Sequence, residues 1–334
     1  MQAALLLTHG LNGLAIREVD VPVPGEGEVR IRVETVGANQ LDLNVISGLG
    51  PGAAAKLPRV LGLDPAGVID AVGEGVDPSR VGEPVVVKPN IPCGTCAQCL
   101  AQREADCPRQ SVVGVHRDGG AAEYITVPSR SAFARGTISA AHATAAMHSL
   151  PIVINAIDVA EVTSADRVLV TGASGTLGQM AVEYLRHLGA DVVAASRKPL
   201  EMASDVLTVE CETPGVLADP ARLGGAVNVV IDVTGHAPTL AAAISGLAWG
   251  GRAVFCSASV DTNLTIDARA FYLGRKRLAG VASADYSQVE RALQLVASGA
   301  VVPPIGSRYA LTDIRRAYQG FAESLPGKVV IDVV

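Results

Sequence analysis

The chain has 334 residues, of which 49% are hydrophobic and 18% charged, and its formal net charge is −6. This length suits two domains better than one, because single cores stop growing near ~250–300 residues. The acidic balance argues against a nucleic-acid partner, which requires a basic face. No run of about 18 apolar residues predicts a membrane span, and MQAALLLTHG has the pattern of a first strand rather than of a signal peptide. We therefore expect a cytoplasmic protein with no membrane partner.

Short Val- and Ile-rich runs closed by Gly and Pro, such as GEVRIRVETVGA and GEPVVVKPN, fill the first ~120 residues. They predict short strands and tight turns in a β-rich unit. Further along, strand-like runs such as DRVLVTG, DVVAASR and VNVVIDVTG alternate with helical patterns such as TLGQMAVEYLRHLGA. That alternation predicts an α/β fold with a doubly wound parallel sheet. In the tail, TDIRRAYQGFAES predicts an amphipathic helix capped by Thr312, before a last strand in PGKVVIDVV.

The segment VLVTGASGTLG, residues 168–178, predicts a strand, a glycine turn and a helix. Gly175 would let the backbone approach a pyrophosphate, and Gly178 would let the helix pack on the strand. The free N–H groups at the helix start would bind the phosphates. A tight turn without a ligand is the alternative. The predicted cofactor-binding residues of this turn and of later strand ends are Gly172, Ala173, Ser174, Gly175, Thr176, Leu177, Gly178, Thr234, Ser257, Ala258 and Ser259.

The end of the next predicted strand favours NADP(H) over NAD(H). NAD enzymes usually place an acidic residue there to hold the ribose 2′-hydroxyl. This chain has Ser196, Arg197 and Lys198 instead, and Arg and Lys can pair with a 2′-phosphate. The alternative is that the two cations are merely solvated.

Four of the six cysteines are closely spaced, as Cys93-x-x-Cys96-x-x-Cys99 followed by Cys107. Two short spacings bring three thiolates to one point, and a longer loop returns the fourth, which is typical of a closed tetrahedral zinc site. Such a site has no open position, so it would organise a lobe at about residues 90–110 and would not catalyse. Disulfides, an iron–sulfur cluster or an empty reduced loop are the alternatives.

Together these residues resemble the medium-chain dehydrogenase/reductase superfamily, of the zinc alcohol dehydrogenase type. The resemblance covers the cysteine lobe, GGAAEYITVP at 119–128, the dinucleotide block and the closing GKVV. It implies a GroES-like catalytic domain at 1–149 and 284–334 and a Rossmann domain at 150–283. It also implies a homodimer through an edge strand, for which RLAGVAS at 277–283 is the candidate.

The chain departs from the zinc-catalytic members of that family at all three ligand positions. Those members carry a Cys at the place of Asn39, a His at the place of Leu63 and a third ligand near Met147. Asn, Leu and Met cannot build the usual site, so the catalytic zinc is predicted to be lost while one structural zinc is kept. Asn39 with Asp42, and Gly-x-Asp ending at Asp64, are similar to the zinc-free quinone oxidoreductase and enoyl reductase branch, which usually lacks the four-cysteine lobe.

These departures favour NADPH-dependent hydride transfer to an activated C=C bond, a quinone or a similar small acceptor, since hydrogen-bond donors can then stabilise the developing charge. Asn39 is the candidate for orienting the carbonyl or the nicotinamide, and Asn44 stands where related reductases often carry a Tyr. Asp42 and Asp64 are expected close by, in a structural role or in proton transfer. His148 is a candidate proton donor, with simple packing as its alternative.

Two other functions stay open from the sequence. One is an alcohol dehydrogenase or ketone reductase that binds a second zinc through unusual ligands such as His148, Asp42 or Asp64. The other is an NADPH-binding protein without catalytic activity.

Overall fold

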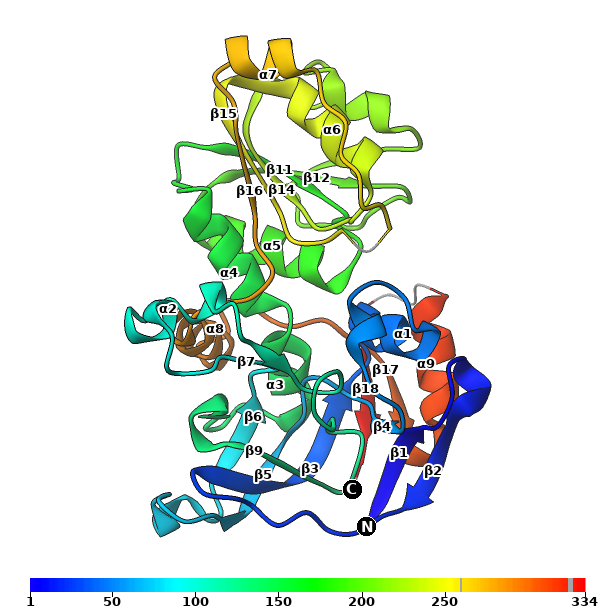
Figure 1. Ribbon diagram of the computed structural model, residues 1–334. Helices are drawn as coiled ribbons and strands as arrows, with labels where there is room; N and C mark the ends of the chain where they lie inside the picture. Colours follow the sequence, from blue (N-terminus) through cyan, green and yellow to red (C-terminus); the bar gives the residue numbers. More distant parts are fainter. Residues whose placement is uncertain (259, 324–326, 334) are drawn as a thin grey trace. The chain divides into compact units, whose positions relative to one another are not determined.

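The computed structural model describes residues 1–258, 260–323 and 327–333. The chain divides into two units (Figure 1). Unit 1 comprises Met1–His148, Asp285–Gly299 and Pro303–Val334, and unit 2 comprises Ser149–Ala284 and Ala300–Val302. The C-terminal tail therefore belongs to the same unit as the N-terminal third of the chain.

Unit 1 is built around a mostly antiparallel sheet. Within the described part of the chain, its order is β10-β6-β5-β3-β18-β17, and β9 also pairs with β3. Smaller sheets join β2-β1-β4 and β7-β8. The strands are β1 (Gln2–Leu6), β2 (Leu14–Glu18), β3 (Glu28–Gly37), β4 (Arg59–Val60), β5 (Ala66–Val72), β6 (Pro84–Val87), β7 (Asn90–Ile91), β8 (Ser111–Val112), β9 (Tyr124–Pro128), β10 (Ala132–Ala134), β17 (Ile305–Ala310) and β18 (Lys328–Asp332).

The helices of unit 1 are α1 (Gln40–Ser47), α2 (Ala97–Leu100), α3 (Ala140–Met147), α8 (Tyr286–Ala297) and α9 (Ile314–Ala322). Helix α3 lies against β3, β5 and β18, while α9 lies against β17 and β18. Strand β18 runs antiparallel to β3, with Ile331 opposite Val36. This pairing brings the last strand of the chain, red in Figure 1, beside one of the first.

The predicted cap at Thr312 is wrong. Helix α9 begins at Ile314 with Asp313 as its N-cap residue. A 3-10 turn spans Leu311–Asp313, and Leu311 is buried in the core of unit 1. Because this anchored turn takes up Thr312, the helix starts one residue later than the sequence pattern predicts.

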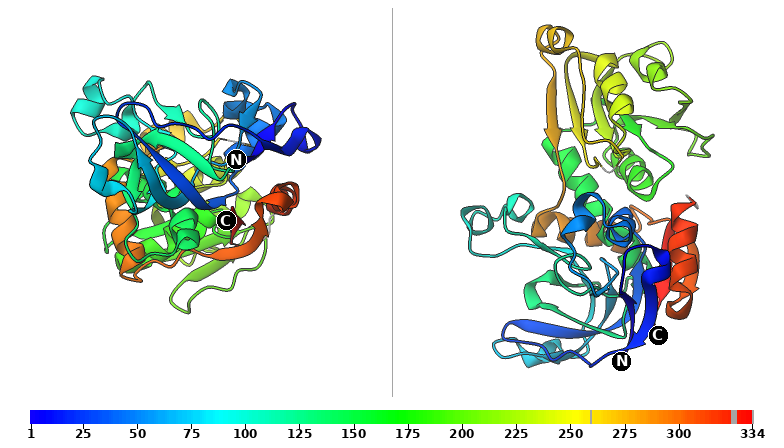
Figure 2. Two further views of the ribbon diagram at one scale, coloured as in Figure 1. Left: turned by 90° about the horizontal axis from the view of Figure 1, so that it is seen from below. Right: turned by 45° about the vertical axis from the view of Figure 1, so that its right-hand side comes forward.

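Unit 2 confirms the predicted α/β fold. Its parallel sheet has the order β13-β12-β11-β14-β15-β16 within the described residues, with α4 and α5 on one face and α6 on the other (Figures 1 and 2). The elements are β11 (Arg167–Thr171), β12 (Asp191–Ser196), β13 (Leu207–Glu210), β14 (Val227–Asp232), β15 (Leu247–Phe255), β16 (Arg277–Gly280), α4 (Leu150–Val159), α5 (Thr176–His187), α6 (Ala237–Gly246) and α7 (Ala268–Leu273).

The strand order of unit 2 reverses at β11, whose successors along the chain lie first on one side and then on the other. In open α/β sheets a ligand binds outside the carboxyl ends of the strands at such a reversal. On one face of the sheet, the core includes the fully buried aliphatic residues Leu169, Val193 and Val230, which form one cluster with Leu240 and Ile244 of α6. No helix in the described residues is both long and apolar enough to cross a membrane.

Candidate functional site

Four polar side chains are buried together in unit 1, between the end of β3 and the start of β18. They are Asn39, Asp42, Asp64 and Lys328, and each is at most 5% exposed. Asn39 is the N-cap residue of α1 and Asp42 lies in its first turn. Asp64 lies between β4 and β5, and Lys328 is the first residue of β18. The fold thus gathers two acids, one base and one amide from three separate parts of the sequence.

Lys328 joins the members of this cluster. Its ammonium donates to the side-chain oxygen of Asn39 at 2.6 Å and to Oδ2 of Asp64 at 2.8 Å. The other oxygen of Asp64 accepts from the backbone N–H of Gly37 at 2.8 Å. A buried carboxylate is therefore met by a buried cation and by a backbone donor, which is what the burial of a charge requires.

Asp42 holds the start of helix α1. Its carboxylate accepts hydrogen bonds from the backbone N–H groups of Asn39 at 2.9 Å and Gly62 at 3.0 Å. Complete burial, reinforced by the charge of Asp64, raises the pKa of Asp42 to about 7. The buried hydroxyl of Tyr318 lies beside Asp42 but lacks a partner with regular hydrogen-bond geometry among the described residues, and burial raises the pKa of this phenol well above its usual value.

The amide of Asn39 is almost fully used inside the cluster. Its nitrogen donates to the carbonyl of Gly37 at 3.2 Å and to Oδ2 of Asp64 at 3.1 Å, while its oxygen accepts from Lys328. A substrate carbonyl would have to displace one of these acceptors. Asn44, by contrast, is half-buried, and its side-chain oxygen accepts from Gln40 at 3.3 Å. The structure thus brings Asn39, Asp42 and Asp64 into one hydrogen-bonded cluster. Asn44 lies outside this cluster and contacts Gln40 instead.

The other two positions that carry zinc ligands in the resembling family are apolar and buried. Leu63 is 0% exposed and Met147 is 2% exposed. Met147 packs in a hydrophobic cluster with Ala66, Val86 and Val289. Neither side chain offers a donor of adequate basicity to a zinc ion. This part of unit 1 therefore does not fit the usual three-ligand catalytic zinc site.

His148 follows helix α3 and is half-buried. Removal from water, together with the positive charge of Lys328, lowers the pKa of His148 to about 4. The imidazole is therefore neutral near pH 7, so it can donate or accept a hydrogen bond but is a poor acid. The role of His148 as a proton donor stays a prediction, and its lowered pKa makes proton donation by the neutral ring unfavourable.

The four cysteines of the predicted zinc lobe converge. Their sulfur atoms lie within 4.8 Å of one another, and the separations are 3.5 Å for Cys96–Cys99, 3.8 Å for Cys96–Cys107 and 4.0 Å for Cys93–Cys99. Tetrahedral zinc–thiolate bonds of ~2.3 Å place sulfur atoms ~3.8 Å apart. The residues therefore fit a four-coordinate ion that keeps no position open for a substrate.

Polar contacts stabilise thiolates in this lobe and tie it to the rest of unit 1. The backbone N–H groups of Cys93 and Gly94 donate to sulfur atoms at 3.3 and 3.4 Å. A hydrogen bond from the backbone of Thr95 lowers the pKa of Cys93 to about 5. The backbone N–H of Ala105 donates to Asp285, the N-cap residue of α8, at 2.7 Å. The lobe is thus anchored on α8.

The glycine turn of unit 2 lies between β11 and α5, as predicted. Gly172 has a φ of +75°, which glycine adopts without strain. A Cβ on Gly178 would lie 2.2 Å from the carbonyl oxygen of Gly172, so the helix start packs against the turn only because this residue is glycine. A Cβ on Gly175 would meet no atom closer than 3.6 Å, and Ser174 and Gly175 are exposed. The outer side of the turn is thus open to a phosphate.

The predicted 2′-phosphate residues lie at the end of β12 in the same unit. Ser196 is buried, and its hydroxyl accepts from the backbone N–H of Lys198 at 3.3 Å. Arg197 and Lys198 are exposed. Across the described residues, the side chains of these two make no ion pair with an acidic group. They are therefore free to receive a dianionic phosphate.

Next to the turn, Asp232 at the end of β14 is fully buried, which sequence reasoning missed. It accepts hydrogen bonds from the hydroxyls of Thr171 and Thr234, the latter at 2.7 Å. Burial raises its pKa. Ser257 and Ala258 follow β15, as predicted, and Ser259 lies outside the described residues.

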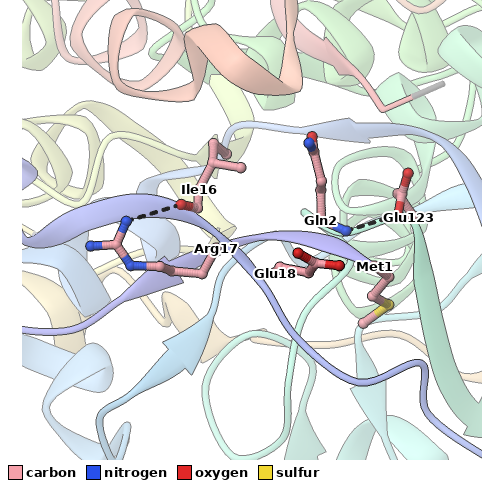
Figure 3. A pocket seen from close by; sticks show the side chains of 6 residues that line it. All are labelled: Met1, Gln2, Ile16, Arg17, Glu18 and Glu123. Atoms are coloured by element: carbon pink, nitrogen blue, oxygen red, sulfur yellow. Dashed lines mark hydrogen bonds between the residues drawn. The ribbon is translucent and has the colours of Figure 1, made fainter.

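Unit 1 also has an open recess on the hairpin of β1 and β2 (Figure 3). In it, the backbone N–H of Gln2 donates to Glu123 at 2.8 Å, and Arg17 donates to the carbonyl of Ile16 at 3.2 Å. The predicted site residues do not line it. We assign this recess no part in the chemistry.

A β-rich unit with a four-cysteine lobe, joined to a doubly wound sheet with a glycine turn, is the architecture of an oxidoreductase. Residues 25–136 match the family described as alcohol dehydrogenase GroES-like domain, and residues 176–298 match the family described as zinc-binding dehydrogenase. The chain belongs to the medium-chain dehydrogenase/reductase superfamily, as predicted.

Individual relatives differ in their reactions. An acryloyl-coenzyme A reductase of Metallosphaera sedula is 31% identical over 338 residues, covering 96% of each chain. The starvation-sensing protein RspB of Escherichia coli is 39% identical over 181 residues, which span 54% of this chain and 52% of that one. A solved structure of an NAD-dependent alcohol dehydrogenase is 30% identical, covers 100% of both chains and has a TM-score of 0.92.

Proposed function

We propose that this protein is an NADPH-dependent reductase that transfers hydride to an activated C=C bond, a quinone or a similar acceptor, without a catalytic zinc. The proposal rests on the side chains at Asn39, Leu63 and Met147, the three positions at which zinc-catalytic relatives bind their ion. Asn39 has its amide bound within a buried cluster, and Leu63 and Met147 are buried apolar side chains. We propose further that one structural zinc is held by the four cysteines.

The chemistry fits a site without a Lewis acid. The glycine turn at 172–178 with Arg197 and Lys198 would hold NADPH, which would supply a hydride to the β-carbon of the acceptor. The charge would spread into the acceptor's carbonyl as an enolate, and water would protonate the α-carbon. Oxidising a simple alcohol also requires removal of the hydroxyl proton, which a bound metal makes easier near neutral pH. The acryloyl-coenzyme A reductase relative supports the reductase assignment, because acryloyl groups are conjugated C=C acceptors.

The preference for NADPH rests on Arg197 and Lys198. Both side chains are exposed at the end of β12, where NAD enzymes usually place an acidic residue. Two cations there form ion pairs with a 2′-phosphate, whereas a neutral 2′-hydroxyl offers them no charge. The alcohol dehydrogenase with a TM-score of 0.92 is NAD-dependent, so the KM values for NADPH and NADH distinguish the two cofactors.

That same structural relative favours one other function, a zinc alcohol dehydrogenase or ketone reductase. The ligands would then be Asp42, Asp64 or His148. In unit 1, however, both oxygens of Asp42 accept backbone N–H groups and Asp64 is paired with Lys328. A metal ion would have to break these bonds.

The test is a comparison of acceptors under one set of conditions. Loss of NADPH absorbance is followed with a cyclic enone, a benzoquinone, an acryloyl thioester and a simple ketone, and formation of NADPH with the matching alcohol. We expect turnover with at least one of the first three and little with the ketone or the alcohol. Turnover of the ketone and the alcohol alone would overturn the proposal. Tight NADPH binding without any turnover would show a protein that binds the cofactor but does not catalyse.

We also propose a homodimer formed through strand β16. This strand ends the described sheet of unit 2, so its outer backbone groups lack strand partners within the described residues, and a second copy can supply them. Trp249 and Tyr272, which are 70% and 75% exposed, belong to the neighbouring β15 and α7. Light scattering during gel filtration should give twice the chain mass. The N–H of Val281 donates inward to Phe255, so the N–H of Leu278, three residues earlier, points outward. Leu278→Pro, which removes it, should shift the protein toward monomer.

A further inference from the structure

The buried cluster of unit 1 already contains a cation, the Lys328 ammonium. It lies 2.6 Å from the amide oxygen of Asn39 and 2.8 Å from a carboxylate oxygen of Asp64. The lysine is 2% exposed, and Asp64 is 0% exposed. The end of the lysine side chain packs directly on the backbone of Gly37, where a Cβ would lie 2.2 Å from Cε and 2.8 Å from Nζ.

We propose that Lys328 is the resident cation of this site and that its ammonium excludes a divalent metal ion from the oxygen atoms of Asn39 and Asp64. This rests on the proposed function, which it deepens by naming the residue that keeps the site free of metal. Carboxylate and amide oxygens are the ligands that hard cations such as Mn²⁺ and Mg²⁺ prefer. A dication bound to the same oxygens would lie within hydrogen-bond range of the ammonium, where like charges repel strongly.

The surroundings of the cluster would support a metal if the ammonium were absent. Asp64 would be left as a buried carboxylate without a cation, which is costly unless another positive charge replaces it. The amide oxygen of Asn39, which accepts from Lys328 at 2.6 Å, would be left as a second buried oxygen without a cation. The charge and the ligands of a cation site are thus present, and Lys328 fills it.

The inference predicts a gain of metal binding when the ammonium is removed. Lys328→Met keeps the length of the side chain but has no charge and no donor. We expect this variant, with zinc in its cysteine lobe, to bind one Mn²⁺ per chain at least about 100-fold more tightly than the wild-type protein does. Binding is measured as loss of the free Mn²⁺ signal in electron paramagnetic resonance, and a rise in melting temperature on adding Mn²⁺ gives a second readout.

Two further variants separate this role from a merely structural one. The double variant Lys328→Met with Asp64→Asn lacks the carboxylate ligand, so it should fold without binding Mn²⁺ at this site. Lys328→Arg keeps the charge and should bind no more Mn²⁺ than the wild type. Lys328→Gln, which keeps a hydrogen-bond donor, replaces Lys328→Met if the latter does not fold.

Two results would overturn the inference. One is a folded Lys328→Met or Lys328→Gln variant that binds no more Mn²⁺ than the wild type. The other is a wild-type protein that binds Mn²⁺ and loses it on Asp64→Asn, since the ammonium would then coexist with the metal. Neither readout needs turnover, so an inactive wild-type protein with the expected Mn²⁺ binding would contradict the proposed function and leave this inference standing.

Discussion

The Lys328 ammonium donates a 2.6 Å hydrogen bond to the side-chain oxygen of Asn39, although the two residues are 289 positions apart in the sequence. The bond links the first residue of β18 to the N-cap residue of α1. It therefore makes the C-terminal tail part of the candidate site in unit 1.

Gly37→Ala should disrupt the cluster. The added Cβ would lie 2.2 Å from Cε and 2.8 Å from Nζ of Lys328, so the lysine would have to move away from its acceptors. Overpacking of this kind costs about 1–3 kcal/mol of the free energy of unfolding, which urea denaturation measures. Gly215→Ala is the control, because a Cβ there meets no atom within 4 Å. Equal stabilities of the two variants would contradict the packing described for Lys328.

Asp42 should make the protein less stable as the pH rises. In the native state burial raises its pKa to about 7, whereas an unfolded Asp titrates near ~3.9. Between these values the unfolded chain releases the proton first, so the free energy of unfolding falls as the pH rises through this window and levels off above about 7. Asp42→Asn should flatten that slope. An unchanged slope in the variant would mean that other groups cause it.

His148 should not control the pH dependence of catalysis near neutrality. Its pKa is lowered to about 4, so the ring stays neutral across the usual assay range. With an acceptor that is turned over, the profile of kcat/KM against pH should keep its shape in His148→Gln between about pH 5.5 and 8. A limb of the wild-type profile that disappears in this variant would make His148 the proton donor and contradict this pKa.

Much of this could be predicted from local sequence patterns. The glycine turn at 172–178 and the four cysteines are short motifs whose spacing fixes their geometry, and the alternation of strands and helices predicts the sheet of unit 2. Asn39 and Asp64 could be predicted from the resemblance, but their partner Lys328 could not, because only the pairing of β18 with β3 brings it to them. Thr312 was predicted wrongly because the buried Leu311 starts a turn that a helix pattern does not reveal.

Removal of both cations at the end of β12 should change the choice of cofactor. Arg197→Ala with Lys198→Ala is expected to raise the KM for NADPH about tenfold or more, equivalent to ~1.4 kcal/mol of binding free energy, and to leave the KM for NADH unchanged. Arg269→Ala, at another exposed arginine of unit 2, is the matched control. A parallel rise for both cofactors would show that these residues do not recognise the 2′-phosphate.

Cys96→Ser should destabilise the metal lobe. The sulfur of Cys96 lies within 3.8 Å of those of Cys99 and Cys107, and binding of a structural zinc is coupled to folding. We expect a lower melting temperature and faster proteolysis of the lobe than in the wild-type protein. Cys211→Ser is the control, since Cys211 lies in unit 2 and its thiol donates to the carbonyl of Thr213. Equal effects of the two substitutions would argue against a metal in the lobe.

The zinc content of the protein purified without added metal decides whether the chain holds a catalytic zinc. We expect one zinc per chain, which is lost in Cys96→Ser, together with NADPH-dependent reduction of an enone, a quinone or an acryloyl thioester. Two zinc ions per chain in the wild type, one of them lost in Asp64→Asn, would contradict this expectation. The cluster around Lys328 would then be a catalytic metal site, and alcohols and ketones would be the substrates to pursue.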